Sequence, residues 1–151
     1  MNSSTFDEFT SRLATEGCGP ALEYLNQGVP HRYTGIYRLK NGVMKNVELA
    51  DKEGEIRPDF LAEVPFEESF CQFVLRDGFF RMSDSGTDNR VDGHKYQGVL
   101  LAYSGVPIED GEGGLWGTLC HFDASAIDLS DADFQLLKQA AKALPPYVVG
   151  D

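Results

Sequence analysis

The sequence has few cysteines and few basic residues for its length. Its three cysteines, Cys18, Cys71 and Cys120, form neither a CxxC pair nor a spacing typical of metal ligands. An odd, widely spaced set indicates reduced thiols in a reducing compartment. Aspartate and glutamate number 24 against 13 lysines and arginines, and the formal net charge is −11. Because such a surface repels polyanions, we expect no nucleic-acid binding.

Long apolar runs are also absent. No segment reaches the roughly 18 apolar residues that a membrane span needs, and the first residues lack the basic and apolar regions of a secretory signal. We therefore expect a cytoplasmic protein without membrane association. At 151 residues, 42% hydrophobic and 25% charged, the chain is expected to form a single domain over residues 1–151.

Motifs that carry enzyme chemistry are missing. The sequence contains no G-x-S-x-G elbow, Walker loop, H-E-x-x-H motif or dinucleotide fingerprint. It contains no EF-hand loop either, so no metal site is expected. The glycine-rich segment 111–114 is acidic and lies between two predicted strands, which favours a turn over a phosphate-binding loop.

Helix signals lie at both ends of the chain and near its middle. The predicted helices cover residues 5–14, 20–28, 69–76 and 130–144. Pro20 suits the first turn of the second helix, and Gly28 suits its end. Gly78 is the expected stop of the third. The Ser130 hydroxyl can cap the last helix, which ends at the prolines after residue 144.

Strand signals cluster between these helices. The predicted strands cover residues 32–39, 43–49, 79–82, 100–108 and 115–123. The pair Asn41-Gly42 is a strong signal for a two-residue hairpin turn. In the strand that follows, Val43, Val47 and Leu49 are expected to share one face.

The last two predicted strands hold the most informative pattern. One face of the final strand should carry Trp116, Thr118, Cys120 and Phe122. Leu119 lies on the opposite face and is expected in the core beside the last helix. Gly105 and Gly117 interrupt the two strands, and a glycine inside a strand usually marks a close approach by a ligand, a helix or another backbone.

The order of these elements predicts an α+β fold. Strands that cluster between flanking helices indicate a central antiparallel sheet of five or six strands. The apolar stripes of the terminal helices need a partner, and the simplest arrangement places both helices on one face of the sheet. The segment from about residue 65 to residue 98 then covers the other face.

Five segments carry, in chain order, a resemblance to GAF domains. They are Arg32–Leu39, Pro65-Phe-Glu-Glu-Ser-Phe-Cys71, Arg81-Met-Ser-Asp84, Tyr103-Ser-Gly-Val-Pro-Ile108 and Gly117-Thr-Leu-Cys-His-Phe-Asp123. The last two resemble the "YxGxPL" and "GxLCxxD" strands of the family. The resemblance is strongest over residues 20–144. The subtype resembles GAF domains attached to bacterial histidine kinases and diguanylate cyclases, and because the sequence contains no such output domain, we expect a stand-alone GAF protein.

The resemblance implies a ligand pocket between the sheet and its mid-chain cover. The residues that it carries over to this pocket are Phe70, Cys71, Asp84, His94, Tyr96, Tyr103, Thr118 and Cys120. Aromatic walls with a few polar atoms suit a small-molecule site. Phe70, Cys71 and Cys120 also fit ordinary core packing, since free cysteine packs as a small hydrophobe.

The function implied by the resemblance is that of a non-catalytic sensor in signal transduction. Such a module binds a small molecule and acts on a signalling partner in trans. The sequence does not name the ligand or any cofactor. The "NKxxF…DE" signature of cyclic-nucleotide GAF domains is missing, and the pair Cys120-His121 lies on the final strand rather than in the segment that carries the bilin cysteine. His94, the histidine best placed for a haem ligand, is expected on an exposed loop.

Two alternatives remain open. One is the free-methionine sulfoxide reductase branch of the family, which uses a "GVCG" cysteine and a second in "GHxxC". Cys71 stands at the first position, but Gln97 occupies the second, and an amide cannot attack a sulfoxide. The other is a dimerisation or scaffold module with a vestigial pocket. In every case we expect a homodimer built on apolar surface that the terminal helices leave uncovered.

Overall fold

A six-stranded antiparallel sheet forms the centre of the computed structural model, which describes residues 5–54, 59–112 and 114–148. The strands are β1 (Tyr33–Lys40), β2 (Val43–Asp51), β3 (Glu63–Pro65), β4 (Phe80–Met82), β5 (Ala102–Glu109) and β6 (Leu115–Asp123). Their order across the sheet is β3-β2-β1-β6-β5-β4. The first and last long strands, β1 and β6, therefore pair at its middle. The predicted α+β fold is confirmed.

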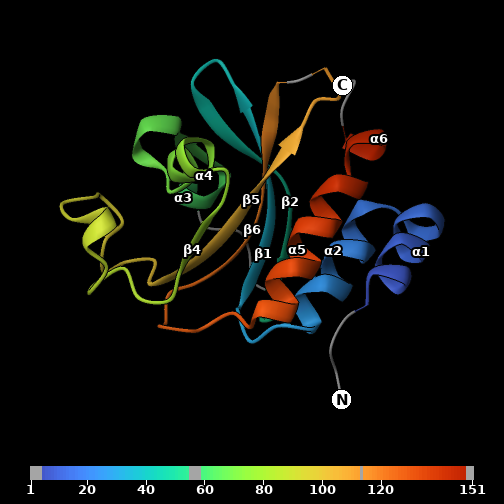
Figure 1. Ribbon diagram of the computed structural model, residues 1–151, viewed down its shortest axis with the longest axis horizontal. Helices are drawn as coiled ribbons and strands as arrows, with labels where there is room; N and C mark the ends of the chain where they lie inside the picture. The colour runs from blue at the N-terminus through green and yellow to red at the C-terminus, as the bar shows by residue number, and fades with distance from the viewer. Residues whose placement is uncertain (1–4, 55–58, 113, 149–151) are drawn as a thin grey trace.

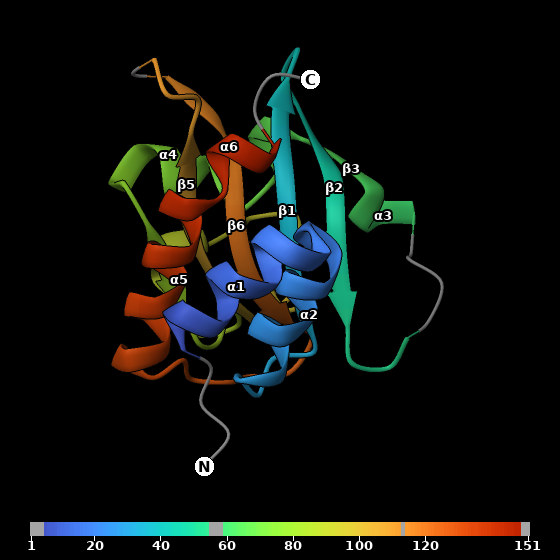
Figure 2. The ribbon, with the colours of Figure 1, turned by 90° about the vertical axis from the view of Figure 1, so that its right-hand side faces the viewer.

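Helices cover both faces of the sheet (Figures 1 and 2). The helices on one face are α1 (Phe6–Glu16), α2 (Cys18–Gln27), α5 (Asp131–Ala143) and the short α6 (Pro145–Val148). The other face carries α3 (Asp59–Ala62), the 3-10 turn Phe66–Glu68, α4 (Cys71–Asp77) and the loop that includes the 3-10 turn Asn89–Val91. The terminal helices thus share one face, as predicted. No helix in the described ranges is long and apolar enough to cross a membrane.

Local signals in the sequence fix the turns and helix ends. Asn41 and Gly42 both adopt left-handed φ angles, 55° and 75°, which close the two-residue turn between β1 and β2. Gly78, with a φ of 82°, ends α4 in a left-handed cap. The Ser130 hydroxyl accepts a hydrogen bond from the backbone N–H of Asp133 at the start of α5. These three predictions are confirmed.

The core between the helices and the sheet, called here the helix-side core, holds the apolar stripes of α1 and α5. Phe9, Leu13, Phe134 and Leu137 are at most 5% exposed and belong to one packed cluster with Leu119. The predicted face of Leu119 is therefore confirmed. Because the chain buries these side chains itself, they offer no apolar surface to a second copy.

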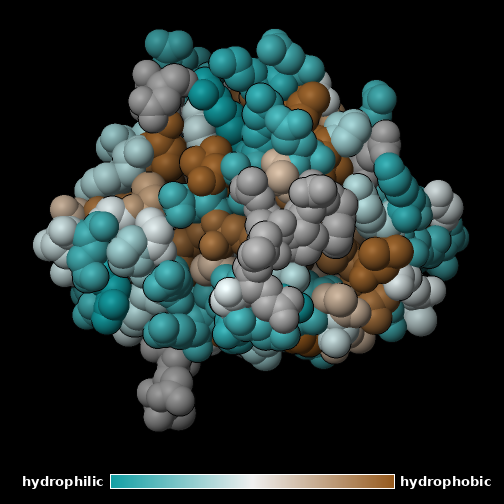
Figure 3. Space-filling view, turned by 180° about the vertical axis from the view of Figure 1, so that it is seen from behind, coloured by the Kyte–Doolittle hydropathy of each residue, from teal (hydrophilic) through white to brown (hydrophobic). Residues whose placement is uncertain are grey.

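Large exposed hydrophobic side chains are dispersed over the described surface. They are Val47, Phe79, Val99 and Tyr147, between 44% and 51% exposed, and they come from separate parts of the fold. On the side opposite to that of Figure 1, hydrophobic residues show in several places between hydrophilic ones (Figure 3).

A β-bulge in β2 changes the faces expected for that strand. Asn46 and Glu48 pair with consecutive residues of β1, so Val47 is the extra residue between them. The prediction that Val43, Val47 and Leu49 share one face is wrong, because one extra residue reverses the alternation beyond it. Val47 points to solvent instead.

A second bulge lies in β6. Leu115 and Gly117 pair with consecutive residues of β5, which leaves Trp116 as the extra residue. Its side chain packs in the helix-side core, whereas Cys120 and Phe122 pack on the opposite side of the sheet. The expectation that Trp116 shares their face is therefore wrong.

Candidate ligand pocket

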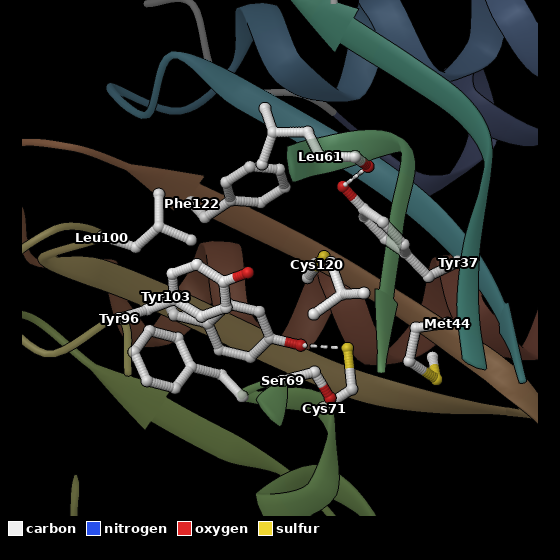
Figure 4. Close-up of a pocket in the computed structure, with 12 residues that line it drawn as sticks. Tyr37, Met44, Leu61, Ser69, Cys71, Tyr96, Leu100, Tyr103, Cys120 and Phe122 are labelled. Atoms are coloured by element: carbon white, nitrogen blue, oxygen red, sulfur yellow. Dashed lines mark hydrogen bonds between the residues drawn. The ribbon is translucent and has the colours of Figure 1, made fainter. Parts of the chain in front are cut away.

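A cavity of about 40 Å³ lies between the sheet and its cover (Figure 4). Its walls are Tyr37, Met44, Leu61, Val64, Ser69, Phe70, Cys71, Tyr96, Leu100, Tyr103, Cys120 and Phe122. The sheet contributes side chains from β1, β2, β3, β5 and β6. The cover contributes α3, the start of α4 and the loop between Asn89–Val91 and β5. The cavity therefore occupies the position in which the GAF resemblance places a ligand.

Cys71, in the first turn of α4, connects the cover to the sheet. Its Sγ atom lies 3.3 Å from the hydroxyl oxygen of Tyr103 on β5 and 3.4 Å from Oγ1 of Thr118 on β6. All three side chains are buried. Burial raises the pKa of the Cys71 thiol and raises the pKa of the Tyr103 phenol well above its usual value. At neutral pH both groups are uncharged, so Cys71 lacks the thiolate character of a nucleophile.

Cys120 supplies a second thiol to the cavity wall. Its Sγ atom lies 3.6 Å from the backbone oxygen of Gly35 on the neighbouring strand β1. Burial raises the pKa of this thiol well above its usual value, and the nearby Cys71 adds to the effect. Cys120 is therefore also a neutral, weakly polar group.

Five of the residues expected at the site line the cavity: Phe70, Cys71, Tyr96, Tyr103 and Cys120. Thr118 contacts the site through its hydroxyl, which lies beside the Cys71 thiol, without itself forming part of the wall. The structure thus brings together residues that lie 50 positions apart in the chain.

Asp84 and His94, which were also expected there, lie outside the cavity walls. The Asp84 carboxylate accepts a hydrogen bond of 2.9 Å from the backbone N–H of Gly86, so it closes the turn that follows β4. The His94 ring packs against Phe70, with 4.6 Å between the ring centroids. His94 therefore contacts the wall residue Phe70 without lining the cavity itself.

The remaining wall residues were not expected from the sequence. Tyr37 on β1 donates a hydrogen bond of 2.8 Å from its hydroxyl to the backbone oxygen of Leu61, which ties α3 to the sheet. Phe122 lies on the same face of β6 as Cys120, as the alternation predicted, and this pattern would have been sufficient to assign it to the pocket. Leu61 and Val64 belong to α3 and β3, which are too short to show a period in the sequence.

Comparison with proteins of known structure identifies the fold. No family model matches the chain, and neither does any curated protein sequence. Solved structures do match it. The GAF domain of a phosphoenolpyruvate-protein phosphotransferase from Acinetobacter superposes with a TM-score of 0.75 and 13% identity, over 97% of this chain and 94% of that one. The chain has a GAF fold.

Other structures with the same fold have different functions. The phycocyanobilin-bound GAF domain from a cyanobacterial phytochrome matches with a TM-score of 0.71 and 14% identity, over 96% of both chains. The type II free methionine-R-sulfoxide reductase from Thermoplasma acidophilum matches with a TM-score of 0.69 and 18% identity, over 95% of both chains. Since one fold serves pigment binding and catalysis, the function of this chain depends on its own site.

Proposed function

We propose that the chain is a non-catalytic sensory or regulatory module, which binds a small molecule in this pocket and acts on a partner protein in trans. The observation that carries the proposal is the position of the cavity between two layers. A ligand there would contact both the sheet and α4 with its neighbouring loop. If the ligand binds one conformation of the cover better than another, it increases the population of that conformation. The surface available to a partner protein then changes.

The state of the cysteines argues against catalysis. A thiol nucleophile needs a lowered pKa and access, whereas Cys71 is buried and its pKa is raised. Gln97, at the position of the reductases' second cysteine, has a structural role. Its amide oxygen accepts a hydrogen bond of 2.9 Å from the N–H of Gly93, and its amide nitrogen donates one of 3.2 Å to the backbone oxygen of Ser85.

The proposal is tested by native mass spectrometry of the purified protein, followed by a thermal-shift screen of metabolites. We expect a bound species or a ligand that raises the melting temperature, because selective binding to the native state stabilises it. A ligand present at 100 times its dissociation constant contributes about 2.7 kcal/mol. If no metabolite of a broad set binds, the scaffold alternative is favoured instead.

The reductase alternative has a separate test, because the fold of those enzymes matches and Cys71 lines the cavity. Free methionine sulfoxide is incubated with the protein and a thiol reductant, and methionine is measured. We expect no turnover. Turnover that is abolished by Cys71→Ser and kept in the matched variant Cys18→Ser would establish the enzyme instead.

Location and assembly complete the proposal. The three cysteines are unpaired in the structure, which supports the reducing environment of the cytoplasm. We also propose a homodimer, built on surface other than the buried stripes of α1 and α5. Because two copies of charge −11 repel, its association should strengthen with salt. Light scattering that reports only monomer at high protein and salt concentration would contradict the dimer.

A further inference from the structure

The lining of the pocket has no means of neutralising a charged ligand. Among the described residues that form its wall, none carries a charged side chain. Three of its hydroxyl groups already have protein partners. Tyr37 donates to Leu61, Ser69 donates to a backbone oxygen at 2.7 Å, and Tyr103 lies beside the Cys71 thiol.

This chemistry constrains what can bind. An ion that entered the cavity would lose its hydration without gaining a counter-charge, and a strongly polar molecule would lose more hydrogen bonds than the few polar atoms of the wall replace. An apolar molecule would lose neither. The wall offers it aromatic rings, aliphatic chains and polarisable sulfur from Met44, Cys71 and Cys120.

The opening of the pocket can be located from burial. Tyr96 and Leu100 are half-buried, whereas the other wall residues are buried. Both belong to the loop between Asn89–Val91 and β5, and Figure 4 shows them on one side of the cavity. The cavity of about 40 Å³ is much smaller than the void of about 150 Å³ that accommodates benzene in an engineered core. A ligand of several heavy atoms therefore has to displace these two side chains.

We infer that the ligand of this pocket is a small, uncharged and predominantly apolar molecule, which enters by displacing Leu100 and Tyr96. The inference rests on the proposed function, since it names the class of molecule that the same pocket takes. It separates this chain from sites that hold zwitterionic or phosphate-bearing ligands, because these need charged partners.

Two probes with a common aromatic ring test the charge requirement. Benzene and benzoate share a ring and differ by an ionised carboxylate at neutral pH. Binding to the full chain is measured by ligand-observed NMR. We expect benzene to bind, and benzoate to bind at least about tenfold more weakly, because its charge stays unpaired in the cavity. Equal or tighter binding of benzoate would overturn the inference while leaving a ligand pocket in place.

Variants of Leu100 test the position of the opening. Leu100→Ala enlarges the cavity and should tighten benzene binding about fivefold, whereas Leu100→Trp fills it and should weaken binding about tenfold. Val99 is 51% exposed and does not line the cavity, so Val99→Ala and Val99→Trp are matched controls. These should change binding by less than about twofold. Circular dichroism confirms that each variant is folded.

The outcomes separate the two proposals. Equal responses at residues 99 and 100 would mean that benzene binds elsewhere, which overturns the inference. If neither the parent chain nor Leu100→Ala binds benzene while the metabolite screen finds a charged ligand, the ligand class is wrong and the proposed function stands. If no probe and no metabolite binds, both fail.

Discussion

The Nδ1 atom of His121 lies 2.6 Å from the hydroxyl oxygen of Thr34, whereas its Nε2 atom has no hydrogen-bond partner within the described residues. His31 lies beside it, with 5.8 Å between the ring centroids, and within the same residues neither of its ring nitrogens has a partner. Both histidine side chains are fully buried. Burial lowers the pKa of His31 to about 4 and lowers the pKa of His121 well below its usual value.

This pair predicts a loss of stability in mild acid. In the unfolded chain both histidines titrate near pH 6.5, so below that pH the unfolded state binds more protons than the folded state. Their contribution is complete above about pH 6.5 and is lost as the pH falls toward 4, by about 1.4 kcal/mol per pH unit for each histidine. The charged groups that act on His31 are Asp123, Lys52 and Asp133. Urea unfolding at a series of pH values measures the slope.

A pair of variants isolates the histidine contribution. His31→Leu removes one titrating ring and should reduce the slope between pH 6.5 and 4.5 to about half. Leu22→Ala is a matched control, because it removes a buried side chain that does not titrate. It should lower stability and keep the full slope. A parent protein whose stability is flat over this range would contradict the role given to both histidines.

Substitution of Gly117 is expected to destabilise the sheet through a clash with the backbone of β1. A Cβ atom at this position would lie 1.9 Å from the backbone oxygen of Tyr37 on β1, a contact that the paired strands cannot relieve without separating. We expect Gly117→Ala to lower the free energy of unfolding by more than about 2 kcal/mol. Gly111, with a φ of 85° and open space around it, is the control, and alanine there should cost about 1 kcal/mol. Equal losses in urea unfolding would show that the strands do not approach as described.

Leu119 tests the assignment of the two faces of β6. It is fully buried against α5, so Leu119→Ala should lower the free energy of unfolding by about 2–5 kcal/mol through lost burial and a cavity. Val47→Ala, at an exposed bulge, should change it by less than about 0.5 kcal/mol. A small effect at Leu119 in chemical denaturation would mean that its side chain does not lie in the helix-side core.

The sequence was most informative where a residue acts locally. Asn41-Gly42 and Gly78 determine their own turns through left-handed backbone angles, so both could be predicted. The interpretation of Gly105 and Gly117 was also correct, since a Cβ at Gly105 would meet Val74 of α4 and one at Gly117 would meet β1. The bulge at Val47 could not be predicted, because it depends on how two strands align.

The candidate site was harder to predict, because it also depends on how segments far apart in the chain come together. Cys71 and Tyr103 lie in segments whose pattern places them on a known face, and the structure brings them within 3.3 Å. Asp84 and His94 lie in a polar loop, and chain order does not say where a loop folds. Leu100 was placed at the start of a predicted strand, because it lies in the apolar run 99–102, whereas β5 begins only at Ala102 and Leu100 belongs to the loop before it.

Thiol labelling tests the state of the cysteines. Burial raises the pKa of all three thiols, but Cys18 is half-buried whereas Cys71 and Cys120 are buried. In the native protein a thiol reagent should therefore modify Cys18 well before the other two, which should react only on unfolding. Mass spectrometry of the peptides identifies the modified residue. Rapid modification of native Cys71 would contradict its description as a neutral wall residue and would favour the reductase.

The central claim, that a small molecule binds between the sheet and its cover, is tested most directly by hydrogen exchange with and without the best ligand from the metabolite screen. Binding in the pocket should slow exchange in α4 and in residues 94–101, since a ligand holds these segments against the sheet. The exchange of α1 should change little. Slowed exchange confined to α1 and α5, with α4 and residues 94–101 unchanged, would contradict the account and place the binding surface on the helical face.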